Sequence, residues 1–294
     1  MAYDTKRQKN LMYSVLLLVP ALIFVLIFLI IPLFKTVYYS FTSWFNFSQT
    51  KTFIGLANYK QFFTDSVVGI ALRNTMLLIV FALIFQVGVA LILAICVDSA
   101  HHGFRFFRTV YFFPIVISAT AIGLMFSLIY KYDYGLLNYI IQAFGGEPQV
   151  WLTKERSIYM LLIPVCWQFV GFYFVVYLTA IANIPIDIYE SAVLDGVKPW
   201  QKAIYITVPM LKSSLVANVV LVISGCFRVF DMVYIITGGG PLNSSQLLSS
   251  YMYYKAFADY NTGYASAIAI IMMVLGLSIT GVVKVFTNKI QGDT

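Results

Sequence analysis

The sequence predicts an all-α membrane protein with six transmembrane helices. Of its 294 residues, 61% are hydrophobic and only 11% are charged, whereas soluble domains carry about 25% charged residues. The hydrophobic residues are gathered into charge-free runs, each long enough for the ~20 helical residues that cross a ~30 Å hydrocarbon core. Both observations indicate that lipid, and not water, surrounds most of the chain.

Six such runs define the expected spans. The first, from Leu11 to Phe34, is too long for the core of a secretory signal, and no small-residue cleavage pattern follows it. We therefore interpret residues 11–34 as an anchored helix that follows a cytosolic N-terminus at residues 1–10. The other runs lie in a transmembrane domain that we place at 70–285, before a cytosolic C-terminal segment at 286–294; they cover 74–97, 109–130, 157–182, 213–236 and 263–283.

Basic residues between the runs orient the chain. With the N-terminus inside, ten Lys and Arg residues lie in cytosolic segments and eight in outer segments, which also carry five acids. The short loop from His101 to Arg108 is basic and has no acid. Both termini are therefore expected in the cytosol. The net charge of +7 reflects this orientation and not nucleic-acid binding, because the cations do not line one face with interleaved aromatic residues.

Other motifs argue against several kinds of site. The three cysteines lie within hydrophobic runs, and His101 and His102 have no Cys or acid at metal-ligand spacing. The glycine run 238–240, before Pro241, is not followed by Lys-Ser or Lys-Thr, so we interpret it as a tight turn and not as a phosphate loop. A membrane enzyme would need clustered His, Asp or Glu at catalytic depth, and the sequence shows no such cluster. We therefore expect a non-catalytic chain that binds no metal and no cofactor.

The longest cytosolic loop, residues 183–209, is expected to contain a short helix. Asn183 can cap it, Pro185 suits its first turn, and Glu190 lies near the positive end of its dipole. Gly196 can supply the left-handed turn that ends it. Such a helix, with small residues beside a carboxylate, suits docking into a basic groove of a partner protein. Its amphipathic pattern alone equally fits a helix that lies on the lipid surface.

The same loop resembles the EAA loop of bacterial ABC importer permeases. The residues that carry the resemblance are Glu190-Ser191-Ala192, Asp195-Gly196 and Ile206-Thr207-Val208-Pro209. In the family this loop holds the coupling helix that seats in a cleft of the ATPase subunit. Ser191 stands where the family usually has a second alanine, and Val208 where it has leucine. The resemblance implies that ATP and Mg are used by a partner ATPase, and that this partner is docked by Glu190, Ser191, Ala192, Asp195, Gly196 and Pro209.

Further stretches, from about Phe53 to Ile270, are similar to maltose-type carbohydrate permeases. They are FIGLANYKQFF, Asn74-Thr75, FRFFRTVYFFP, WQFVGF, FDMVYIITGGGP and YASAIAI. This resemblance implies a type I ABC importer permease fold in a bacterial cytoplasmic membrane. It also implies a heterodimer with a second homologous permease subunit, two ATP-binding subunits and an extracytoplasmic sugar-binding protein.

The implied cargo is a sugar, with an oligosaccharide favoured. Another small solute, such as glycerol phosphate, is the alternative within the same family. An ion-coupled secondary transporter is a third hypothesis, and it would need membrane-embedded acids or histidines as ion sites. Only Asp231 among the acids falls within an expected span, which disfavours this third hypothesis.

Candidate substrate contacts lie on the fourth and fifth spans. Aromatic faces stack on sugar rings and amides bind hydroxyls in apolar pockets, and span four offers Trp167, Gln168 and Phe172. Counted back from Glu190, these residues correspond to the part of span four that contacts sugar in maltose-type relatives. Counted forward from Pro209, the residues that match the family's span-five contacts are Val222, Gly225 and Cys226. Packing between helices is the alternative role for each of them.

Arg228 and Asp231 are three residues apart on the expected fifth span, so they should face one another. Arg228 follows Lys212 by 16 residues, roughly 24 Å along a helix, which places the pair in the outer third of the membrane. The pair either lines the entry for the sugar or braces the outer helix ends.

Overall fold

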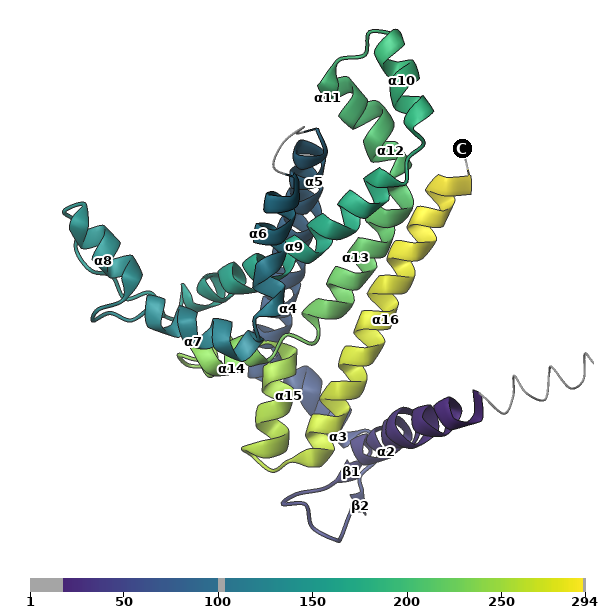
Figure 1. Cartoon of the computed structure of the whole chain (residues 1–294). Coiled ribbons are helices and arrows are strands. Elements are labelled where there is room, and N and C mark those ends of the chain that lie inside the picture. Colours follow the sequence, from purple (N-terminus) through teal and green to yellow (C-terminus); the bar gives the residue numbers. More distant parts are fainter. Residues whose placement is uncertain (1–17, 100–103, 293–294) are drawn as a thin grey trace, which may run out of the picture. The chain divides into compact units, whose positions relative to one another are not determined.

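The computed structural model describes residues 18–99 and 104–292. Expectations for residues 1–10, for the beginning of the first span and for His101 and His102 lie outside the described residues. Almost all of the described secondary structure is helical (Figure 1), so the predicted all-α class is confirmed. Four of the described helices are long and apolar enough to cross a membrane, or six if each of two bent helix pairs counts as one span.

The chain forms two compact units. The first comprises the described residues up to Thr64 together with Met252–Ile271, and the second comprises Asp65–Tyr251 and the described residues from Met272 onward. Helices α15 (Leu248–Phe257) and α16 (Thr262–Gly292) contribute residues to both units. All candidate functional residues belong to the second unit.

The first unit contains the helix Leu18–Ser40, which ends in α2 (Ile31–Ser40) after a π-helical turn, η1 (Leu26–Ile30). The most apolar part of this helix has a mean hydropathy of 2.7, as expected for a helix that crosses a membrane. A short antiparallel ribbon follows, in which β1 (Thr42–Ser43) pairs with β2 (Thr52–Phe53).

The end of this helix is tied to α3 (Ala57–Thr64) by one buried side chain. Asn58 Nδ2 donates to the carbonyls of Ser40 and Thr42, at 2.9 Å each. Carbonyls at a helix end have no partner within the helix, and Asn58 supplies one.

Two long helices form the centre of the second unit. One is the 33-residue helix Ser66–Asp98, which consists of α4 (Ser66–Ala82), the π-helical η2 (Leu83–Val89) and α5 (Ala90–Asp98). The other is α9 (Ser157–Ala182), whose bounds equal those predicted for span four. Helix α9 packs against α5 and against α6 (Phe104–Val116). The remaining helices of this unit are α7 (Ala119–Ile129), α8 (Leu136–Ala143), α10 (Ile186–Leu194), α11 (Pro199–Lys202), η3 (Ala203–Thr207), α12 (Val208–Met210), α13 (Lys212–Cys226) and α14 (Asp231–Ile236).

The expected third span, 109–130, is a bent pair of helices and not one straight helix. Helices α6 and α7 meet at 92°. Pro114 lies near the end of α6, where it cannot donate the hydrogen bond that continues a helix. Ser118 then starts α7 anew, because its Oγ accepts a hydrogen bond from the Ala121 N–H at 3.2 Å.

The expected fifth span, 213–236, ends earlier than the hydrophobic run. Helix α13 stops at Cys226 and α14 begins only at Asp231. On its other side, a bend of 69° separates Pro199–Met210 from Lys212–Cys226. The run of apolar residues continues across the break to Ile236, which is why hydrophobicity alone overestimated this helix.

Gly171 allows α9 to approach α6 closely. A Cβ atom at this position would overlap the carbonyl group of Tyr111. Because the obstacle is backbone, it cannot move aside as a flexible side chain could. The contact therefore requires glycine.

We expect Gly171→Ala to separate the two helices and to lower the melting temperature of the purified protein by roughly 5 °C, as overpacking costs about 1–3 kcal/mol. Gly69→Ala is the matched control, since a Cβ at this helical glycine would meet nothing within 4 Å. It should leave the melting temperature unchanged or raise it. Thermal unfolding in detergent, followed by intrinsic fluorescence, measures both variants, and equal behaviour of the two would contradict the close contact.

Candidate substrate cavity and coupling segment

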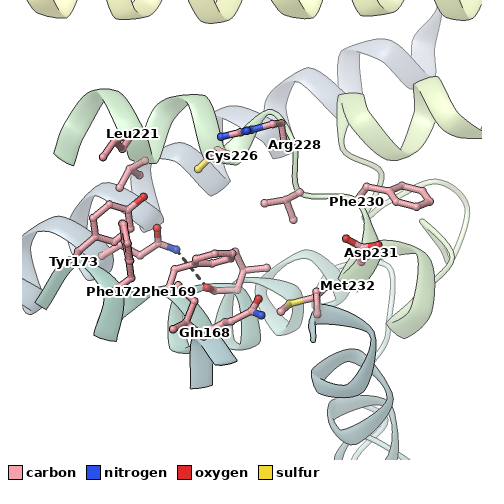
Figure 2. Close-up of a pocket in the computed structure, with 17 residues that line it drawn as sticks. Gln168, Phe169, Phe172, Tyr173, Leu221, Cys226, Arg228, Phe230, Asp231 and Met232 are labelled. Carbon is pink, nitrogen blue, oxygen red and sulfur yellow. Dashed lines mark hydrogen bonds between the residues drawn. The ribbon is translucent and has the colours of Figure 1, made fainter. Parts of the chain in front are cut away.

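A cavity opens between α9, α13 and the start of α14, within the second unit (Figure 2). Its volume of about 480 Å³ lies in the range of small-molecule sites, ~300–1,000 Å³. Its walls are mainly aliphatic and aromatic, and a few polar groups interrupt them. The polar and aromatic lining residues are Gln86, Gln168, Phe169, Phe172, Tyr173, Arg228, Phe230 and Asp231.

Seven of the eight residues that the sequence nominated as substrate contacts line this cavity. They are Gln168, Phe172, Val222, Gly225, Cys226, Arg228 and Asp231. They come from α9, from α13, from the turn that follows α13 and from the first residue of α14. The structure thus brings together groups that lie far apart in the sequence.

Trp167 does not line the cavity. Its ring lies 5.9 Å from that of Phe126, centroid to centroid, and it borders a separate apolar hollow with Phe81 and Phe85. Gln168 faces the first cavity, whereas the Trp167 side chain turns toward Phe126 and the separate hollow. This residue therefore has the packing role that was the alternative.

Sequence reasoning missed ten lining residues, of which Gln86, Phe169, Tyr173 and Phe230 are polar or aromatic. Phe169 precedes the nominated residue Phe172 by three positions and Tyr173 follows Phe169 by four, so helical spacing from Phe172 leads to both. Gln86 lies on the second span, where its only signal was an amide inside a charge-free run.

Gln168 links the cavity to the break between α6 and α7. Its Nε2 donates to the carbonyl of Ile117 at 3.1 Å, and Ile117 lies between the two bent helices. Its Oε1 is buried and has no hydrogen-bond partner among the described residues. The amide nitrogen therefore supplies a hydrogen bond to the carbonyl at the helix break, and the amide oxygen can still accept one from a ligand.

Arg228 and Asp231 do not face one another as expected. The three-residue spacing implies contact only on a continuous helix, and α13 ends at Cys226, before Arg228. No ion pair joins them among the described side chains. In Figure 2 the Arg228 guanidinium lies beside Cys226, whereas Asp231 lies near Met232. Both charges border the cavity separately, so the hypothesis of a bracing ion pair is not supported.

The loop 183–209 folds as the predicted short helix followed by a second helical piece. The N-cap residue of α10 is Pro185 and not Asn183 as expected. Asn183 is instead the C-cap residue of α9. Gly196 takes the predicted left-handed conformation, with φ of +71°. The Val197 N–H then donates to the Ala192 carbonyl at 3.0 Å and closes the helix end.

The residues that resemble the EAA loop are mostly exposed. Glu190 and Ser191 lie on the open face of α10, whereas Ala192 is 5% exposed and faces inward. Ala192 therefore allows α10 to lie close to its own chain, and does not offer its methyl group to a partner. The open surface of this segment also carries apolar residues, of which Leu194 is 88% exposed.

A small polar cluster holds α10 against the segment that leads to α13. The hydroxyls of Tyr189 and Thr207 lie 3.1 Å apart, and Lys202 Nζ lies 4.1 Å from the centre of the Tyr189 ring. Burial raises the pKa of Tyr189, the hydrogen bond with Thr207 lowers it, and the charge of Asp98 raises it. Asp98 is the last residue of α5, and the contacts of Tyr189 with Thr207 and Lys202 join α10 to η3 and α11.

We expect Tyr189→Phe to loosen α10, because it removes a hydrogen bond worth about 0.5–1.5 kcal/mol. Amide exchange over residues Ile186–Leu194 should become up to about tenfold faster, as measured by hydrogen–deuterium exchange mass spectrometry. Tyr205→Phe is the control, since Tyr205 is 68% exposed, and it should leave exchange unchanged. Unaltered protection in Tyr189→Phe would show that the hydroxyl contact does not fix α10.

Comparisons with known proteins agree with this architecture. Residues 90–292 match the family described as "Binding-protein-dependent transport system inner membrane component". The chain is 41% identical over 277 residues to the probable ABC transporter permease protein YurN of Bacillus subtilis, a match that covers 92% of this chain and 94% of YurN. It is 30% identical over 268 residues to the trehalose/maltose transport system permease protein MalF of Thermococcus litoralis, and 90% of each chain is covered.

A solved structure shares the fold. It is a bacterial ABC transporter involved in the import of the acidic polysaccharide alginate, with a TM-score of 0.85 at 23% identity and 98% of each chain covered. That transporter is also known in complex with an alginate pentasaccharide-bound periplasmic protein. The expected resemblance to importer permeases is confirmed. The chain belongs to the binding-protein-dependent ABC transporter permeases of the carbohydrate-importer type, as a non-catalytic, multi-pass membrane subunit.

Proposed function

We propose that this chain passes a sugar, with an oligosaccharide favoured, through the cavity between α9 and α13. The observation that carries the proposal is the make-up of that cavity, in which Phe172 and Tyr173 offer ring faces and Gln168 an amide with one free oxygen. Sugars bind by stacking and by hydrogen bonds in such pockets. Relatives named for trehalose, maltose and alginate support the same solute class.

In this proposal the chain works within a larger complex. A second homologous permease forms a heterodimer with it, two ATPase subunits use ATP and Mg, and an extracytoplasmic sugar-binding protein delivers the solute. The complex lies in a bacterial cytoplasmic membrane with both termini of this chain in the cytosol, and the chain itself binds no cofactor.

Transport follows from alternating access. Closure of the ATPases moves the segment 186–200, and the Tyr189–Thr207 contact carries that movement into η3. Pro209 and the bend of 69° connect this segment to α13, whose residues Val222 and Cys226 line the cavity. Motion at the docking surface therefore reaches the solute site along one continuous stretch of chain.

For the docking role we expect Glu190→Lys or Gly196→Asp to abolish uptake and to weaken association with the ATPase, while membrane insertion stays intact. Glu190 is exposed on α10, so its charge reversal meets the partner directly. Gly196 has a backbone φ of +71°, a conformation that residues with a side chain rarely adopt. Co-purification of the ATPase and solute uptake measure the effect. Glu147→Lys, a charge reversal at an exposed position outside this loop, is the control, and normal uptake by both loop variants would exclude the docking role.

For the solute site we expect Gln168→Ala and Phe172→Ala to lower the rate of uptake or change the sugar preference. Loss of one stacking or hydrogen-bonding group, worth about 1 kcal/mol, corresponds to a severalfold change. Uptake of labelled maltose, trehalose and alginate oligosaccharides by the reconstituted complex measures it. Trp167→Ala, outside the cavity, should leave the preference as it is. Unchanged transport by the two cavity variants across this panel would remove both residues from the site.

One observation favours the alternative of a smaller anionic solute such as glycerol phosphate. Arg228 borders the cavity without an ion pair to the neighbouring Asp231, so its guanidinium could meet a phosphate or carboxylate. Glycerol phosphate therefore belongs in the same uptake panel. Uptake of this solute alone would support the alternative, and uptake of neutral sugars alone would exclude it.

A further inference from the structure

Two buried polar side chains lie just beyond the cavity, on the side of the coupling segment, the name we give to residues 186–200. Tyr177 of α9 and Asn218 of α13 are both 0% exposed, and they approach one another. Neither the Tyr177 hydroxyl nor the two polar atoms of the Asn218 amide have a partner with good hydrogen-bond geometry among the described residues. The pair is therefore a polar spot with unused donors and acceptors.

The pair continues both walls of the cavity. Tyr177 follows Tyr173 by four residues on α9, and Asn218 precedes Val222 by four residues on α13. Residues four apart lie on the same face of a helix, and Tyr173 and Val222 both line the cavity. Tyr177 is thus the next position toward the end of α9 that leads to α10, and Asn218 lies toward the end of α13 that joins α12 (Figure 1).

Stability does not explain these two residues. A buried polar group without a partner costs about 1–3 kcal/mol, and apolar groups of similar shape would avoid this cost. The buried amide of Asn74, by contrast, donates to the carbonyls of Ser244 and Gln246, at 2.8 and 2.9 Å, although the Ser244 hydroxyl is itself buried without a partner among the described residues. Another buried atom without a partner, Oε1 of Gln168, belongs to a residue of the cavity itself. Polar residues of this kind inside a membrane commonly mark the path of a solute.

We infer that Tyr177 and Asn218 form a second polar station, which binds a hydroxyl group as the solute leaves the cavity toward the coupling segment. The Asn218 amide offers two N–H donors and an acceptor, and the Tyr177 phenol offers one donor and one acceptor. Together they can pair with a solute hydroxyl, which both donates and accepts a hydrogen bond. The inference rests on the proposed transport function. A water molecule has the same hydrogen-bonding chemistry, so the test must separate a fixed water site from a path that opens and closes.

Thiol accessibility tests the station without knowledge of the solute. Asn218→Cys and Tyr177→Cys are introduced separately into the importer assembled with its second permease and ATPase subunits. The probe is the cationic, water-soluble reagent MTSET, and fragment-ion mass spectrometry locates the label within the peptide, which separates the new thiol from the native Cys166 and Cys226 on the same helices. Ile223→Cys is the control, because Ile223 is 2% exposed on the same helix and does not line the cavity.

We expect both new thiols to react at least tenfold faster in one of two states, nucleotide-free or trapped with ATP and vanadate, and the Ile223→Cys thiol to react slowly in both. Equal labelling in the two states would assign the spot to a fixed water and overturn the path. Labelling as slow as the control in both states would overturn it as well.

A second measurement separates a transport role from a structural one. Tyr177→Phe should leave the melting temperature of the complex unchanged or higher, because it removes a hydroxyl without a partner, yet it should slow uptake of the labelled sugars severalfold. Tyr130→Phe is the opposite control, since its hydroxyl donates to the Met160 carbonyl at 2.9 Å and its loss should lower stability but spare uptake. A destabilised Tyr177→Phe with normal uptake would overturn the station. If the wild-type complex imports none of the sugars, the sugar proposal fails, while the thiol result still decides the path.

Discussion

Inside a hydrocarbon layer, a backbone carbonyl that loses its helical partner must find a donor within the protein, because no water is present. This constraint shapes the second unit. Pro164 lies inside α9 and, lacking an N–H, leaves the Met160 carbonyl without its usual partner; the Tyr130 hydroxyl donates to that carbonyl instead. The break after α6 exposes the Ile117 carbonyl, and Gln168 donates to it. Each repair joins α9 to the third span, and the cavity lies where these joined elements cannot fill the space.

The same constraint connects the proposed solute site with the proposed coupling segment. Near the membrane surface the chain can break more freely, and here it forms α10, α11 and η3 before the bend that leads into α13. The Tyr189–Thr207 contact and the Lys202 ammonium over the Tyr189 ring hold these short pieces together. We expect a short helix attached in this way to move together with η3. A displacement at Glu190 therefore has a route to α13, whereas a flexible loop would absorb it.

The sequence was informative where a local rule decides the structure. The bounds of α9 follow from a hydrophobic run that begins directly after Arg156, and the left-handed Gly196 follows from the need to end a helix. The sequence was less informative about the direction in which a side chain faces and about whether a helix continues through a hydrophobic run. Trp167 was misplaced because hydrophobic composition does not fix which way a helix faces, and the Arg228–Asp231 contact failed because the helix end at Cys226 has no strong local signal. Tyr177 and Asn218 could not be paired from the sequence, since only the packing of α9 on α13 brings them together.

Unsatisfied polar groups have a thermodynamic consequence for a protein with two conformations. The groups of Tyr177 and Asn218 destabilise the conformation in which they are buried and unpaired, by about 1–3 kcal/mol for each such group. In a conformation that admits water or a solute hydroxyl this cost disappears, so the pair favours opening toward the coupling segment. A ligand shifts such an equilibrium only if it binds one conformation more tightly than the other. A solute whose hydroxyl reaches the pair only in the open conformation binds that conformation more tightly. On the proposed path the solute therefore stabilises its own exit route, and ATP hydrolysis by the partner ATPase subunits has to supply only the remaining free energy.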